Sequence, residues 1–210
     1  MHSDESTLPD DNDDTLLVAG YREDGTLDDV IVAHLDDADP RRRVLALRAA
    51  QRRGLLGDDQ WRAALTSPDV DVRRESLTLI AAADSFDGSI LALVVAALED
   101  EDALVVDAAA FALGERLHEG AVEGLIAVAT GHEDARCRES AIAALGAIGD
   151  DRARGAIIAA LEDRPPVRRR AIVALANFEG PDIEAALARA SEDRDWQVRA
   201  AVDQLSRDEQ

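Results

Sequence analysis

A nine-residue pattern recurs along the chain, and this repetition limits the folds that the sequence can adopt. The pattern is an apolar residue, an Arg, two variable residues, a small residue, an aliphatic residue and another aliphatic residue three positions later. It is clearest in residues 72–80, 137–145 and 167–175. Residues 105–113 fit it except that Val106 replaces the Arg, and weaker copies begin at 42 and 198.

A fixed spacing links the copies. The residue three positions before the pattern is an Asp in five copies and Arg164 in the remaining copy. These positions are 39, 69, 102, 134, 164 and 195, so successive copies differ by 30, 33, 32, 30 and 31 residues. A period of this length is typical of solenoids, in which each repeat buries its apolar face only against its neighbours.

Each period contains two apolar segments with helical spacing, separated by Pro or Gly. Hydrophobic residues make up 47% of the chain but aromatic residues only 3%, a composition that suits closely packed helices better than strands. The sequence therefore predicts an all-α fold, a right-handed α-solenoid of about six two-helix repeats. The predicted helix pairs cover about 27–53, 58–83, 88–116, 119–148, 150–177 and 181–207.

The negative charge is concentrated near the N-terminus. The net charge is −21, and residues 1–39 hold 13 acidic residues against one Arg. We expect residues 1–14 to be a disordered acidic tail, because their charges repel one another and little apolar surface offsets the cost of ordering. Residues 15–210 are expected to form a single solenoid domain.

Charge and composition also narrow the function classes. An acidic surface repels phosphate backbones, which disfavours nucleic-acid binding. No charge-free apolar run is long enough to span a membrane, and the N-terminus lacks the basic and apolar regions of a secretory signal. Cys137 has no second Cys with which to form a disulfide. These features predict a cytoplasmic monomer.

The repeated Asp, Val-Arg, Ala and Leu positions resemble the HEAT family, and more narrowly the short HEAT-like repeats of the phycobilin lyase type. The resemblance covers about 180 of the 210 residues. It implies a ladder of Asp and Arg side chains along the stack, broken at Val106 and Arg164. The ladder residues would be Asp69 with Arg73, Asp134 with Arg138, Asp195 with Arg199, and Arg168.

Two enzymes of this repeat family provide the catalytic alternative. Phycobilin lyases bind an open-chain tetrapyrrole, and deoxyhypusine hydroxylase binds two irons through His-Glu pairs just after the Val-Arg step. Here those places hold residues 74–75, 139–140 and 169–170, none of them His-Glu, while His118 and His132 fall in predicted turns. No phosphate loop, zinc-type spacing or Ser-nucleophile motif is present. We therefore predict no catalytic residue, metal or cofactor, and a buried structural thiol at Cys137.

The favoured function is a non-catalytic scaffold or adaptor that binds a protein partner. In such arrays the second helices line the concave face. Two Arg triplets, residues 41–43 and 168–170, stand at the starts of second helices. They could bind a carboxylate, a phosphate or an acidic peptide, pair with the acidic residues of the surface, or receive the acidic tail. The candidate partner-binding residues are Arg42, Arg43, Arg74, Phe111, Arg169 and Arg170.

Overall fold

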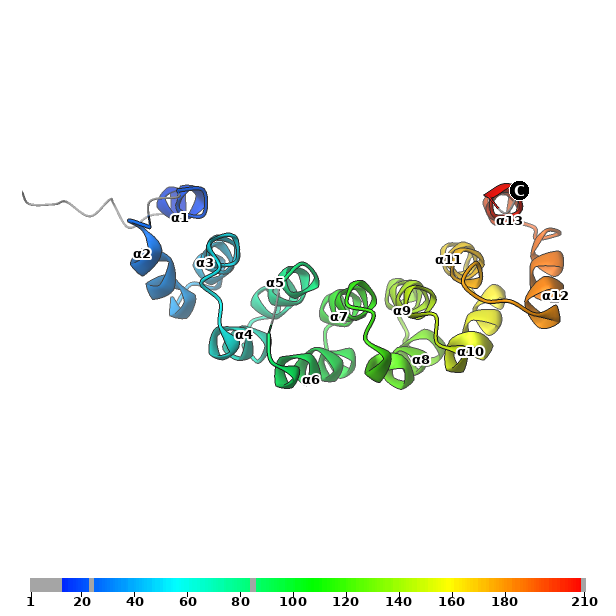
Figure 1. Ribbon diagram of the computed structural model, residues 1–210, viewed down its shortest axis with the longest axis horizontal. Helices are drawn as coiled ribbons and strands as arrows, with labels where there is room; N and C mark the ends of the chain where they lie inside the picture. The colour runs from blue at the N-terminus through cyan, green and yellow to red at the C-terminus, as the bar shows by residue number, and fades with distance from the viewer. Residues whose placement is uncertain (1–12, 23–24, 84–85, 209–210) are drawn as a thin grey trace, which may run out of the picture.

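The computed structural model describes residues 13–22, 25–83 and 86–208. Within these ranges the chain forms thirteen α-helices and five short 3-10 helices and contains no strand. The helices follow one another in a single curved row, with the two ends of the row far apart (Figure 1). The predicted all-α solenoid is therefore confirmed.

After α1 (Asp13–Ala19), the α-helices come in six pairs. The pairs are α2 (Asp28–Ala33) with α3 (Pro40–Arg53), α4 (Asp58–Leu65) with α5 (Val70–Ala81), α6 (Gly88–Ala96) with α7 (Ala103–Glu115), α8 (Val122–Gly131) with α9 (Ala135–Ile148), α10 (Arg154–Ala159) with α11 (Pro165–Leu175), and α12 (Pro181–Ala190) with α13 (Trp196–Asp208). The 3-10 helices are η1 (His34–Asp36), η2 (Ala97–Glu99), η3 (Glu119–Ala121), η4 (Asp151–Ala153) and η5 (Ala160–Glu162).

The two helices of each pair belong to different layers. The second helices, from α3 to α13, form the inner row of the arch, and the first helices, from α2 to α12, form the outer row (Figure 1). Helix α1 stands at the head of the inner row, where it packs against α3. Each inner helix packs against the inner helices before and after it, as α7 does with α5 and α9. The concave face is thus built by the second helices.

The recurring Asp sets the start of most inner helices. Asp39, Asp69, Asp102, Asp134 and Asp195 each accept a hydrogen bond from a backbone N–H two or three residues later, at 2.8 to 3.1 Å. This satisfies a donor that the first helical turn leaves without a partner. Helix α11 is the exception: Arg164 supplies no side-chain cap, and Pro165 begins the helix. Pro suits this position because its missing N–H would have had no intrahelical acceptor.

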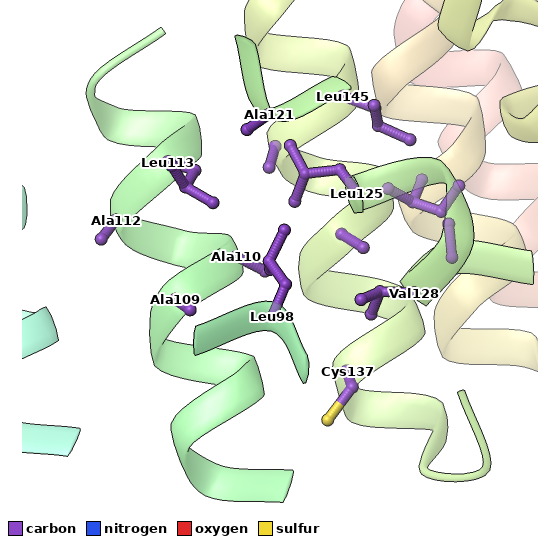
Figure 2. Close-up of a cluster of buried hydrophobic side chains, with 14 of the residues drawn as sticks. Leu98, Ala109, Ala110, Ala112, Leu113, Ala121, Leu125, Val128, Cys137 and Leu145 are labelled. Carbon is purple, nitrogen blue, oxygen red and sulfur yellow. The ribbon is translucent and has the colours of Figure 1, made fainter. Parts of the chain in front are cut away.

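Small residues let the inner helices approach closely. Buried Ala and Leu side chains of α7 and α9 face one another and the outer helices (Figure 2). A Cβ added to Gly114 would lie 2.8 Å from Ala144 Cα, and one added to Gly146 would lie 2.5 Å from Ala174 Cβ. The contacts between α7 and α9 and between α9 and α11 therefore depend on the absence of a side chain at these two glycines.

The N-terminal boundary differs from the predicted one. Most of the predicted tail, residues 1–12, lies outside the described residues. Asp13 and Asp14, which we predicted to belong to the tail, instead form the first turn of α1. Two effects favour this helix: its Leu16 and Ala19 are buried, and acidic residues are favourable at a helix N-terminus. Among the described residues, none of the helices is both long and apolar enough to cross a membrane.

Candidate functional site

Arginines near the starts of the inner helices connect successive repeats. Arg73 donates from Nε and Nη2 to the two carboxylate oxygens of Asp100, at 2.8 and 2.9 Å, and from Nη1 to the Ser67 carbonyl oxygen at 2.9 Å. Arg138 makes the same two-pronged contact with Asp163, both distances being 2.7 Å. We call the pairs Arg73–Asp100, Arg138–Asp163 and Arg168–Asp193 the ladder.

The pairing within the ladder corrects the prediction. Arg73 was expected to pair with Asp69 of its own repeat, and Arg138 with Asp134. Instead, Asp69 and Asp134 cap their own helices, and each arginine reaches an acid that precedes the inner helix of the next repeat. An N-cap carboxylate already accepts a backbone N–H, and the arginine extends across the joint to the neighbouring repeat.

The last repeat shows the same correction. Asp195 caps α13, and Arg199 donates to the Asp193 carbonyl oxygen at 2.7 Å rather than to Asp195. The predicted break at Arg164 is also wrong, because Arg168 donates to both oxygens of Asp193 at 2.8 Å. Arg164 occupies only the cap position, so replacing Asp there leaves the ladder pair intact.

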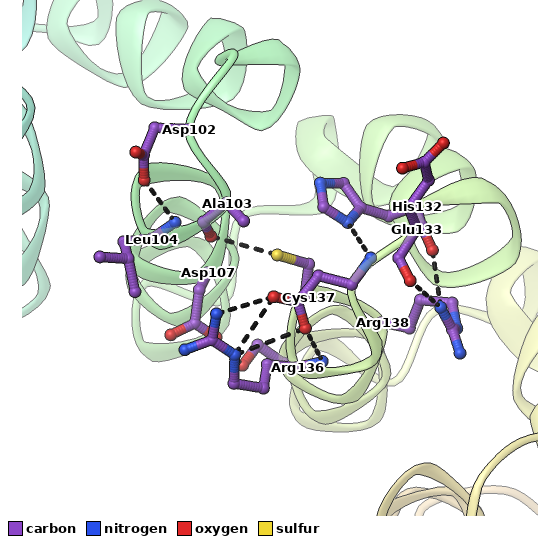
Figure 3. Close-up of polar contacts among 11 residues, drawn as sticks. Asp102, Ala103, Leu104, Asp107, His132, Glu133, Arg136, Cys137 and Arg138 are labelled. Carbon is purple, nitrogen blue, oxygen red and sulfur yellow. Dashed lines mark hydrogen bonds and ion pairs between the residues drawn. The ribbon is translucent and has the colours of Figure 1, made fainter.

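At Val106 the ladder lacks both its arginine and the acid that would face it from the next repeat. Val106 is buried, and the place of the facing acid is taken by His132, whose Nδ1 accepts the Asp134 backbone N–H at 3.0 Å (Figure 3). A different polar link joins α7 to α9: the Ser140 hydroxyl donates to the Asp107 carboxylate. The loss of the arginine is therefore matched by the loss of the acid that would have faced it.

The ladder carboxylates are shifted toward the charged form. Hydrogen bonds from Arg138 lower the pKa of Asp163, and those from Arg168 lower the pKa of Asp193. For Asp100, burial acts to raise the pKa, but hydrogen bonds from Arg73 and a backbone N–H leave it lowered. Side chains in the ladder are 5% to 18% exposed, so these pairs belong to the packing of the array.

Most of the predicted partner-binding arginines have partners within the chain. Arg42 lies 3.2 Å from Asp13 and 3.7 Å from Asp37, and Arg43 donates to the Asp37 carbonyl oxygen at 2.7 Å. Arg74 pairs with Asp71 at 3.1 Å. The internal pairs agree with the alternative in which surface acids neutralise the Arg clusters.

The second Arg cluster lies on α11, farther along the inner row (Figure 1). Arg169 donates to Gln197 Oε1 at 3.1 Å. Arg170 lies 3.6 Å from Glu139, and the two side chains are 44% and 30% exposed. This contact is long and its side chains are partly exposed to solvent. Of the two arginines, Arg170 is therefore the one held by a weak ion pair.

Phe111 stands at a hollow on the inner row. Its side chain is half-exposed. A cavity of about 270 Å³ opens beside it between α7 and α9, with Arg170 at its edge. Sequence reasoning missed two carboxylates of this hollow, Glu115 and Glu139. The available signal for Glu115 is its position four residues after Phe111, which places both on one helix face.

The thiol of Cys137 is buried between α7 and α9. It donates to the Ala103 carbonyl oxygen at 3.1 Å (Figure 3). Burial, followed by the nearby Asp134 and Asp107 charges, raises its pKa from 9.0 to about 11. The thiolate is therefore scarce at neutral pH.

We expect a thiol reagent to label Cys137 at least about a hundredfold more slowly in the folded protein than in denaturant at neutral pH. The rise of two units in pKa lowers the thiolate fraction by that factor, and burial blocks access further. The measurement is the rate of disulfide exchange with a chromogenic aromatic disulfide. A Cys137→Ser variant gives the blank, and equal rates with and without denaturant would contradict the assignment.

The described residues contain no group of three or more His, Cys, Asp or Glu placed to hold a metal ion. His118 and His132 lie at the ends of short connections, as the sequence indicated.

Comparison with known proteins identifies the repeat. Residues 91–166 match the family model described as HEAT repeats. This segment consists of HEAT repeats. No curated protein matches the sequence. Among solved structures, the chain is similar in fold to the Escherichia coli protein YibA, with 20% identity and a TM-score of 0.66, over 90% of this chain and 71% of that one.

Designed proteins share the fold as well. A designed armadillo repeat protein in complex with the peptide (KR)4 has 16% identity and a TM-score of 0.62, over 85% of this chain and 97% of that one. Another designed armadillo repeat protein has 16% identity and a TM-score of 0.59, over 84% and 97%. The likeness establishes a HEAT or armadillo-type solenoid, a fold consistent with a scaffold.

Proposed function

We propose that this solenoid is a non-catalytic scaffold that binds a polypeptide partner on its concave face. The observation that carries this proposal is the exposure of apolar side chains on the inner row. Phe111 of α7 is 50% exposed and Val173 of α11 is 57% exposed, on either side of α9. Exposed apolar groups that gather along one face of a charged protein are a common feature of interaction sites.

The similar fold of known peptide binders supports the proposal. The designed armadillo repeat protein described above is a complex with a peptide. A curved row of parallel inner helices offers a long continuous surface, which suits an extended polypeptide better than a small molecule. On this proposal the predicted arginines Arg42, Arg43, Arg74, Arg169 and Arg170 lie at the margins of this surface, where they influence which charge on the partner is accepted.

The catalytic alternative has no comparable observation in its favour. The positions where the hydroxylase resemblance would require His-Glu pairs hold other residues, and no residue motif specific to bilin transfer is present. We therefore propose binding without catalysis.

Removing the exposed apolar side chains of the inner face is expected to release the partner. With the double variant Phe111→Ser, Val173→Ser as bait, recovery of the partner from the native organism should fall at least about tenfold, because the apolar area that the two side chains bury at the interface is lost. The measurement is quantitative mass spectrometry after affinity purification.

The matched control places the same substitutions off the inner face. Val32 of α2 is 45% exposed and Leu117, in the connection after α7, is 58% exposed. The variant Val32→Ser, Leu117→Ser should recover the partner as the unmodified protein does. Circular dichroism verifies that both variants keep their helices. Equal recovery by the inner-face and control variants would refute binding at the concave face.

A further inference from the structure

We propose that the hollow between α7 and α9 receives an arginine or lysine side chain of the partner, so that the partner segment is basic. This inference rests on the proposed function and names the chemistry of the partner at one place on the concave face.

The floor of the hollow is apolar. It is formed by Gly114 of α7 and by Ala143, Ala144 and Ala147 of α9. Because the two helices touch where Gly114 meets Ala144, no large side chain covers the floor. Phe111 stands at the edge with half of its side chain exposed. The methylene stem of an arginine or lysine can lie along such a surface while its charged end stays at the rim.

The rim carries carboxylates that can accept a cation. Glu115 is exposed, and among the described residues no ion pair holds its carboxylate. Glu139 of α9 also lines the hollow, and within the described residues its ion pair is with Arg170, at 3.6 Å. A third acid, Asp107, accepts the Ser140 hydroxyl beside the hollow.

Phe111 favours a cation over an anion. The face of an aromatic ring carries partial negative charge, so it attracts a guanidinium or ammonium group placed within about 6 Å of its centre. Two such contacts occur among the described residues: Arg116 lies 4.7 Å from the centre of the Phe86 ring, and Arg52 lies 4.5 Å from that of Tyr21. An acidic segment would meet Glu115 and Glu139 in the same place.

Arg170 gives this proposal a distinctive test. It now lies beside Glu139 at the edge of the hollow, where it competes with an incoming cation. Its removal should therefore tighten the binding of a basic segment. If the segment were acidic, Arg170 would be a binding residue and its removal would weaken binding.

The experiment measures fluorescence anisotropy of a labelled octapeptide of alternating Lys and Arg with the full chain. We expect Phe111→Ala to weaken binding about fivefold, the upper range of an exposed cation–π contact. We expect Glu115→Gln to weaken it about threefold and Arg170→Ala to tighten it about threefold, the range of exposed ion pairs. Glu162→Gln, an equal charge change at an exposed position of η5, should leave the affinity unchanged.

Three results would overturn the proposal. They are no binding of the basic octapeptide, equal affinity of Phe111→Ala and the unmodified protein, and a Glu-Asp octapeptide whose binding weakens in Arg170→Ala. None of them depends on the inner-face bait experiment. If the bait variant still loses its partner, concave-face binding stands and only the basic chemistry is wrong. If it keeps its partner, binding at the concave face itself is wrong.

Discussion

Replacing Arg168 by alanine is expected to lower the free energy of unfolding by about 3 kcal/mol or more, the cost of breaking a buried ion pair from one side. Arg168 is 4% exposed. It donates to both oxygens of Asp193 at 2.8 Å and to the Asp163 carbonyl oxygen at 2.8 Å. Its loss removes both arginine donors from a mostly buried carboxylate, which keeps only the Asp195 backbone N–H among the donors of the described residues, and removes one donor from a carbonyl oxygen. The measurement is urea denaturation followed by circular dichroism.

The matched control lies two residues farther along the same helix. Arg170 is 44% exposed on its side chain and lies 3.6 Å from Glu139. Arg170→Ala should change the free energy of unfolding by less than about 1 kcal/mol. If both variants lost the same stability, the ladder would have no special role in the packing of the repeats.

Acidic pH should reduce the effect of the Arg168 substitution. Hydrogen bonds from Arg168 lower the pKa of Asp193 below 3.8, the value expected for an unfolded chain. The stabilisation from this lowered pKa is fully present above about pH 4 and is lost as the pH falls through the lowered folded value. The difference between the unmodified protein and Arg168→Ala should therefore be largest near neutral pH and shrink toward about pH 3. A constant difference would indicate packing rather than charge.

The sequence predicted the repeat and the fold class because both follow from local features. The recurring Asp caps a helix through a backbone N–H no more than three residues later. Each period of the sequence corresponds to one helix pair. The partner of each ladder arginine depends instead on how one repeat stacks on the next. A signal for it does exist: Asp100 and Asp193 each stand two residues before a cap Asp, and the acid is absent at His132, where its arginine is replaced by Val106.

The candidate site was harder to predict for the same reason. Phe111 could be singled out because an aromatic residue is rare in this chain. Glu115 and Glu139 are two of many acids, and only the close contact of α7 with α9 brings them to one hollow. The Arg triplets were candidates because of their sequence alone. In the structure, Arg168 is paired within the ladder, and Arg42 is paired with Asp13 and Asp37.

Adding one methyl group at Gly146 is expected to destabilise the array by about 2 kcal/mol. The Cβ of Gly146→Ala would lie 2.5 Å from Ala174 Cβ and 2.7 Å from Ala174 Cα, so α9 and α11 must move apart. Overpacking of this kind costs up to about 3 kcal/mol, which exceeds the gain of about 1 kcal/mol from replacing Gly by Ala in a helix. The hydrogen bond from Asn177 to the Gly146 carbonyl oxygen, at 2.8 Å, crosses the same contact.

Gly155→Ala separates the cost of overpacking from the gain in helix preference, because these two effects change the free energy of unfolding in opposite directions. Gly155 lies in α10 of the outer row, and nothing lies within 4 Å of the Cβ that the substitution adds. Only the helix preference remains, so this variant should be more stable than the unmodified protein by up to about 1 kcal/mol in urea denaturation. A Gly146→Ala variant that was equally stabilised would mean that the inner helices can separate at little cost. In that case close contact at Gly146 would not be what sets the spacing of the inner row.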